Sequence, residues 1–99
     1  MTTAADIDID RLALSQELLT IAENFVTEEG HWREPNAKRE CRRVANHLAD
    51  LARHVVRGNA DLVKADAYAR AGAVILANVV GTRRFFTSSS HLTPVEEQP

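Results

Sequence analysis

A row of arginines on one segment of the chain is the first feature with side chains able to do chemistry. Within residues 35–57, Arg39, Arg42, Arg53 and Arg57 recur with a spacing that puts them on one face of a helix, and Arg43 flanks them. A guanidinium offers a planar fork of donors that binds a carboxylate or a phosphate through paired hydrogen bonds. The row predicts a surface for an acidic protein, with a nucleic-acid backbone as the alternative.

The charge distribution leaves several interpretations of this row open. Residues 1–34 carry eight acidic and two basic residues, a net charge of −6, whereas residues 35–57 carry six basic and two acidic residues, a net charge of +4. The arginines are then a solvated face, a seam against the acidic first segment, or a partner surface. The chain's net charge of −2, its pI near 6.0 and the lack of aromatics among the basic residues disfavour nucleic acid.

Trp32, the only tryptophan, stands between the acidic and the basic segments. Tryptophan is enriched among the residues that dominate binding energy at interfaces. In a chain with only 5% aromatic residues, it can instead close the end of the hydrophobic core. With both interpretations open for Trp32, the candidate partner-binding residues are Trp32, Arg39, Arg42, Arg43, Arg53 and Arg57.

Metal and catalytic chemistry find little support. His47, Asp50 and His54 share one helical face, but arginines at both ends of that face would repel a cation. The single Cys41 excludes a multi-cysteine zinc site, and it falls among apolar positions, where an inert thiol is expected. The sequence contains neither a G-x-S-x-G turn nor a glycine-rich phosphate loop. We therefore expect a non-enzymatic protein with no cofactor and no metal.

The first element that positions these residues is an amphipathic helix over about residues 8–29. Between residues 12 and 26 the apolar side chains fall on one half of the helical wheel, and Glu28 falls with the polar residues on the other half. Asp8 or Asp10 is the expected N-cap. Ser15 lies inside the apolar arc and needs a backbone hydrogen-bond partner.

Glycine and proline predict the remaining helix boundaries. Gly30 is expected to end the first helix in a left-handed conformation, and Pro35 fits the first turn of a second helix over about 35–57. Gly58 then ends the second helix, and Asn59 is the expected cap of the third. The apolar side of the second helix faces the core, so its arginines point outward.

The third helix, over about residues 60–84, is apolar almost all the way round. A helix of this kind is normally buried on all sides, and two other helices in a chain of 99 residues can hardly cover it. We therefore predict a homodimer formed largely through this helix. Its small-residue side, which allows close backbone approach, consists of Ala65, Ala69, Gly72 and Ala73.

These elements predict an all-α fold, a three-helix antiparallel bundle, with a helical domain over residues 1–86 and a flexible tail over 87–99. The longest apolar run, AGAVILANVVG, is about half the length that spans a bilayer, and the acidic start of the chain does not resemble a secretory signal. We therefore expect a cytoplasmic adaptor or regulatory protein that binds a protein partner, is not associated with a membrane, and has nucleic-acid binding as its alternative function.

Overall fold

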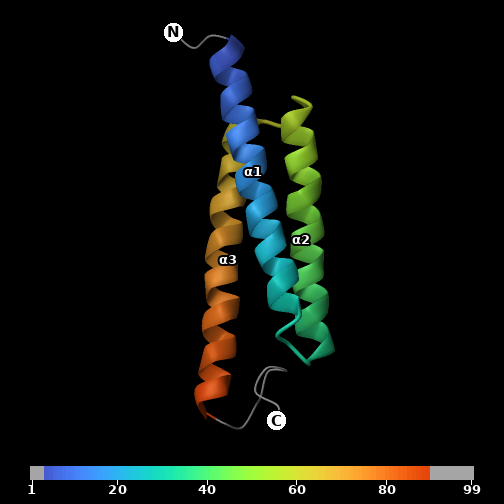
Figure 1. The fold of residues 1–99 in the computed structure, drawn as a ribbon, viewed down its shortest axis with the longest axis vertical. Helices are drawn as coiled ribbons and strands as arrows, with labels where there is room; N and C mark the ends of the chain where they lie inside the picture. The colour runs from blue at the N-terminus through green and yellow to red at the C-terminus, as the bar shows by residue number, and fades with distance from the viewer. Residues whose placement is uncertain (1–3, 90–99) are drawn as a thin grey trace.

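Three helices and no strand make up the part of the chain that is described, residues 4–89, with side chains described over residues 9–85. In the computed structural model these are α1 (Ala4–Glu29), α2 (Pro35–Val56) and α3 (Leu62–Ser89). α1 and α3 run in the same direction and α2 runs antiparallel to both (Figure 1). The predicted three-helix bundle is confirmed. α3 passes the predicted domain boundary at 86, and residues 90–99 of the predicted tail lie outside the described residues.

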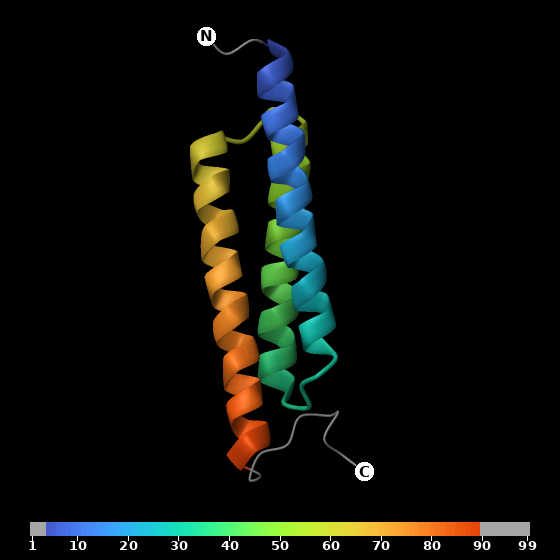
Figure 2. The same cartoon turned by 60° about the vertical axis from the view of Figure 1, so that its left-hand side comes forward.

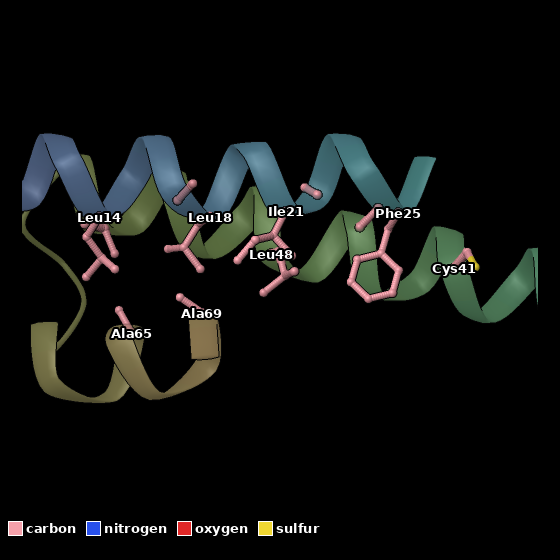
Figure 3. Packing of buried hydrophobic residues seen from close by; sticks show 12 residues of the cluster. Leu14, Leu18, Ile21, Phe25, Cys41, Leu48, Ala65 and Ala69 are labelled. Carbon is pink, nitrogen blue, oxygen red and sulfur yellow. The ribbon is translucent and has the colours of Figure 1, made fainter. Parts of the chain in front are cut away.

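The core lies mainly between α1 and α2. Figure 3 shows Leu14, Leu18 and Phe25 of α1 pointing toward the interior, with Ala65 and Ala69 of α3 on the opposite side. Large side chains of α1 and α2 fill this space, whereas α3 contributes buried alanines and packs Leu62, Leu76 and Val79 against the core only partly buried. The buried hydrophobic residues are Leu14, Leu18, Ile21, Ala22, Phe25, Cys41, Ala45, Leu48, Ala52, Val55, Ala65 and Ala69.

One buried hydroxyl ties α1 to α2. The Oγ atom of Ser15, which is 3% exposed, donates to the carbonyl oxygen of Ala52 at 3.1 Å. This confirms the prediction that Ser15 requires a backbone partner, because a buried hydroxyl without one is costly. The bond also requires α1 and α2 to approach closely at this point.

The start of α2 and its end follow the predicted pattern. The Glu34 carboxylate accepts hydrogen bonds from the backbone N–H groups of Asn36 and Ala37, at 3.1 and 2.8 Å, and Pro35 occupies the first turn. At the other end Gly58 has φ of 77°, a left-handed conformation that other residues adopt at a cost. The Asn59 N–H then reaches back to the His54 carbonyl at 2.9 Å and completes the helix stop.

The predicted N-caps of α1 and α3 and the predicted conformation of Gly30 are wrong, although α1 does end at Glu29 as expected. Asp8 and Asp10 lie inside α1, because the helix begins at Ala4, in a segment whose alanines favour helix and whose acids suit a helix start. Gly30 is not left-handed, since its N–H bonds to the Thr27 carbonyl at 3.1 Å in a tightened last turn.

The third of these errors concerns the start of α3. Asp61, rather than Asn59, supplies the cap, because its Oδ1 atom accepts from the backbone N–H of Val63 at 2.9 Å. Asn59 instead belongs to the end of α2, as its bond to His54 shows.

The small-residue side of α3 faces its own bundle. Ala65 and Ala69 are buried, and a Cβ atom added to Gly72 would lie 3.1 Å from Cδ1 of Leu48 and 3.4 Å from Cγ2 of Ile21. Three of the four residues of this side are therefore covered within one chain, which contradicts their predicted use as a dimer seam, whereas Ala73 is exposed. The small residues there let α3 approach the α1–α2 pair closely.

The outer side of α3 carries the exposed apolar residues. Among them Val63, Val74 and Phe85 are 78%, 60% and 66% exposed. Figure 2 shows α3 standing beside the α1–α2 pair, with one whole side turned away from it. Within residues 4–89, none of the helices combines the length and the hydropathy needed to cross a bilayer.

Candidate binding surface

The arginines of α2 form an exposed outer face. Arg42, Arg43 and Arg53 keep 69%, 68% and 61% of their side-chain surface exposed, and Arg39 and Arg57 are exposed as well. The opposite side of the helix is buried through Cys41, Ala45, Leu48, Ala52 and Val55. The helical period therefore points these guanidinium groups to solvent, as expected from the sequence. We call Arg39, Arg42, Arg43, Arg53 and Arg57 the basic face.

Three arginines of the basic face form ion pairs with carboxylates. Arg43 bonds Glu40 at 2.8 Å and Arg53 bonds Asp50, both on α2 itself. The pairing holds the pKa of the Glu40 carboxyl below its usual range, chiefly through the hydrogen bond from Arg43. Exposed pairs of this kind contribute little to stability, because solvent screens them. The basic face is therefore partly neutralised but not covered.

Among the described residues, the basic face forms an ion pair with α1 through Glu29, at the end of that helix. Arg42 bonds Glu29 at 2.5 Å, and this hydrogen bond raises the pKa of the Arg42 guanidinium. Within the described residues, no ion pair joins an α2 arginine to Glu17, Glu23 or Glu28. The basic face is therefore not an internal seam along the acidic helix.

An apolar groove of about 420 Å³ separates α2 from α3 on one side of the basic face. Trp32 and Arg43 both line it, so the structure brings these two candidate residues together. The rest of the lining is mostly apolar and comes from α2 and α3, with Phe25 contributed by α1. Its other lining residues are Phe25, Ala37, Glu40, Cys41, Val44, Ile75, Asn78, Val79 and Thr82. We call this hollow the α2–α3 groove.

A second hollow, of about 290 Å³, lies between α1 and α2 on the other side of the basic face. Arg53 and Arg57 line it, whereas Arg39 and Arg42 line neither hollow. Its remaining lining residues are Ser15, Leu19, Ala52 and Val56. We call this hollow the α1–α2 groove. Four of the six candidate residues are thus divided between two grooves on either side of α2.

Trp32 is held by a buried ion pair that sequence reasoning missed. Its indole Nε1 donates to the Glu28 carboxylate at 3.0 Å, and Nε of Arg83 donates to the same oxygen at 2.6 Å. Glu28 is 3% exposed, so its predicted place on the outer face of α1 is wrong. The carboxylate tolerates burial because two donors satisfy it. This cluster joins the C-terminal ends of α1 and α3 and fixes the position of Trp32.

The register of the sequence contains a signal for this ion pair. Glu28 follows Phe25 by three residues and Ile21 by seven, so it continues the buried stripe of α1. Arg83 follows Val79 by four residues and Leu76 by seven in α3. Two opposite charges at core positions of neighbouring helices indicate a buried pair.

Histidine and cysteine side chains occupy other positions near the basic face. The His47 ring contacts the Tyr68 ring edge-on, with centroids 5.6 Å apart, and so links α2 to α3. Among the described residues no cluster of three or more His, Cys, Asp or Glu side chains is arranged to hold a metal. Cys41 is 3% exposed, and burial, aided by nearby acids, raises the pKa of its thiol.

Comparison of the chain with models of protein families, with curated proteins and with solved structures finds no match. The function must therefore be inferred from the basic face and from the two grooves beside it.

Proposed function

We propose that this chain is a small non-enzymatic adaptor or regulatory protein that binds an acidic protein partner through the basic face of α2. The observation that carries the proposal is the row of exposed guanidinium groups, of which those of Arg39 and Arg57 make no ion pair within the described residues. Apolar grooves border the row on both sides. Carboxylates of a partner can bind the arginines while its apolar side chains enter a groove.

The partial neutralisation of the basic face favours a protein over a nucleic acid as the partner. Glu29, Glu40 and Asp50 lie among the arginines and would repel the continuous phosphates of a duplex. A protein surface can place its carboxylates only where a guanidinium receives them. The cytoplasmic location remains a sequence-based prediction.

A comparative pull-down from a native lysate tests the proposal. The wild-type chain is compared with the double variant Arg42→Glu/Arg53→Glu, whose fold is checked by circular dichroism. Reversing two exposed charges should change stability by only about half a kcal/mol each, yet at an interface like-charge contacts cost several kcal/mol. We expect the double variant to lose the acidic partner. Retention of the same partner at the same yield would contradict the proposal.

A matched experiment tests nucleic acid in place of a protein. Wild-type chain is titrated with random duplex DNA at two salt concentrations. Binding that falls steeply with salt and is lost in the double variant would assign the basic face to nucleic acid instead.

We also propose that the chain forms a homodimer through α3, by its outer side. The support is the exposed apolar surface there, to which Val63, Val74 and Phe85 contribute. Exposed apolar side chains gathered on one face mark an interaction surface. Light scattering should give twice the 11.0 kDa mass of one chain at micromolar concentration, and Val74→Asp should return it to one. A single-chain mass for the wild type would contradict the dimer.

A further inference from the structure

An exposed apolar stripe runs along α1 next to the basic face. Leu12, Leu19 and Val26 recur every seven residues, which is about two helical turns, and so they share one side of α1. They are 56%, 41% and 57% exposed. Aliphatic side chains at this repeat are typical of a seam that packs against another helix. Within the described chain no helix covers this seam.

The α1–α2 groove joins this stripe to the arginines. Leu19 lines the groove from α1, and Val56, itself 55% exposed, lines it from α2 together with Arg53 and Arg57. The floor of the groove consists of the small side chains of Ser15 and Ala52, where a hydrogen bond joins the two helices. The groove therefore has an apolar strip on its α1 side, a basic rim on its α2 side, and a floor that allows a close approach.

We propose that the α1–α2 groove binds an acidic amphipathic helix of the partner, which lies along α1 as a fourth helix of the bundle. This inference rests on the proposed function and specifies the form of the acidic partner. Apolar side chains of the bound helix pack on Leu12, Leu19 and Val26. Carboxylates on one flank of that helix form ion pairs with Arg53 and Arg57. The stripe is about 21 Å long at 1.5 Å per residue, which corresponds to a bound helix of about four turns.

Charge complementarity selects an acidic occupant for this groove. Arg57 makes no ion pair within the described residues, and Arg53 pairs only with Asp50, an exposed neighbour on the same helix. A basic amphipathic helix would bring like charges together at this rim, at a cost of several kcal/mol. The α2–α3 groove offers less selection, because its lining contains Arg43 together with its partner Glu40 and no arginine beyond this pair.

The probe for this proposal is a synthetic amphipathic peptide of three heptads with leucines along one side and glutamates along one flank. It is titrated into the full chain and followed by fluorescence anisotropy. Two matched peptides serve as controls, one of the same composition in scrambled order and one with lysine in place of glutamate. We expect each control peptide to bind at least about tenfold more weakly, which corresponds to about 1.4 kcal/mol.

Variants of the chain locate the binding to the groove. Leu19→Asp and the double variant Arg53→Glu/Arg57→Glu should each weaken the acidic peptide by at least about tenfold. Ala77→Asp and Lys64→Glu change exposed residues of the same kinds on α3, outside both the groove and the basic face, and should leave the affinity for the peptide within about twofold. The exposure of all these positions lets the fold survive, which circular dichroism checks.

The outcomes separate this inference from the proposed function. If the charge reversals abolish peptide binding but Leu19→Asp does not, the basic face binds acids without the groove, and only the fourth-helix inference falls. If no peptide binds, or if Leu19→Asp converts a dimer into single chains in light scattering, the inference also falls, and the latter result assigns the groove to the acidic α1 of a second copy. The pull-down with Arg42→Glu/Arg53→Glu tests the proposed function independently.

Discussion

The α1–α2 hairpin and α3 hold the same bundle together by different means. α1 and α2 bury Phe25, Leu18, Leu48 and Val55, whereas the buried hydrophobic residues of α3 are alanines. The larger apolar residues of α3 are either partly buried, as Leu76 and Val79 are, or exposed, as Val74 is. The apolar content of a helix therefore does not determine how much of it is buried within its own chain. How closely a helix packs against the rest of the bundle depends instead on whether its inward-facing side chains are small enough to permit close approach.

Close approach and large-side-chain burial stabilise in different ways. Each large aliphatic or aromatic side chain buried in the hairpin contributes about 1.5–3 kcal/mol through removal of apolar surface from water. The alanines and Gly72 of α3 bury little surface of their own but bring its backbone near Leu48 and Ile21. The buried pair of Glu28 and Arg83 then fixes the far end of α3.

The largest effect should come from truncating the hairpin core. Phe25→Ala removes an aromatic ring that is 1% exposed, and the cavity should lower the free energy of unfolding by about 3–5 kcal/mol. Ile75→Ala in α3, where the side chain is 44% exposed, should cost less than about 1 kcal/mol. Urea denaturation of both variants gives the values. Equal losses would abolish the contrast between the two regions.

The second-largest loss of stability should come from removing one partner of the buried ion pair. Arg83→Met leaves the Glu28 carboxylate buried with the Trp32 indole but without its cation, at a cost of about 3 kcal/mol. Amide hydrogen exchange should then accelerate in α3 before it does in the hairpin. The double variant Glu28→Gln/Arg83→Met should recover much of the loss, because no uncompensated charge remains. A double variant as unstable as the single one would show that the pair has another role.

Substitutions of the two glycines of α3 should change stability less, but in opposite directions, and so they test which side of α3 is covered. Gly72→Leu should destabilise by about 1–3 kcal/mol, because its side chain would meet Leu48 and Ile21 and push α3 away. Gly81→Ala has open space around the added methyl and should stabilise the helix by about 0.5–1 kcal/mol. Thermal denaturation distinguishes the opposite signs. Two losses of similar size would mean that both sides of α3 are covered.

The smallest predicted effect is the contribution of the Cys41 thiol to the loss of stability at high pH. Burial raises the thiol pKa above its ordinary value of 9.0. As the pH rises from that value toward the folded-state pKa, the unfolded chain releases a proton that the folded chain keeps, so stability falls. Cys41→Ala should lack this part of the pH dependence when both proteins are unfolded in urea. Rapid alkylation of the native thiol at pH 8 would contradict its burial.

Much of the fold could be predicted from the sequence because α1 and α2 are amphipathic. In α2 one apolar arc specifies both its buried side and the exposure of Arg42 and Arg53 opposite it. In α1 the apolar arc is wider than the buried side, because Leu19 and Val26 within it are exposed. The sequence of α3 does not identify its buried side, because apolar residues occur on almost all of its faces. Only the packing shows that Ala69 and Gly72 face inward. Glu28 was misplaced because a carboxylate at a core position is read as exposed unless its partner, Arg83, is known.

The candidate site could be predicted only in part. That the arginines share an outward face follows from the helical period alone. The grooves beside α2 depend on the spacing between helices, which periodicity does not give. The assignment of Trp32 and Arg43 to one groove, and of Arg53 and Arg57 to the other, therefore needed the structure.

The connections between α1 and α2 (residues 30–34) and between α2 and α3 (residues 57–61) are equally short, so the order of folding should follow from the larger side chains buried in the α1–α2 hairpin. Closing a short loop costs little entropy, and proteins rich in local contacts fold in microseconds to milliseconds. We expect the rate-limiting nucleus to be the α1–α2 hairpin, with α3 docking after it. Substitutions in the hairpin core, such as Leu18→Ala, should then slow folding. Substitutions at Ala69 should mainly speed unfolding, so the lifetime of the native state would depend on the least deeply packed helix.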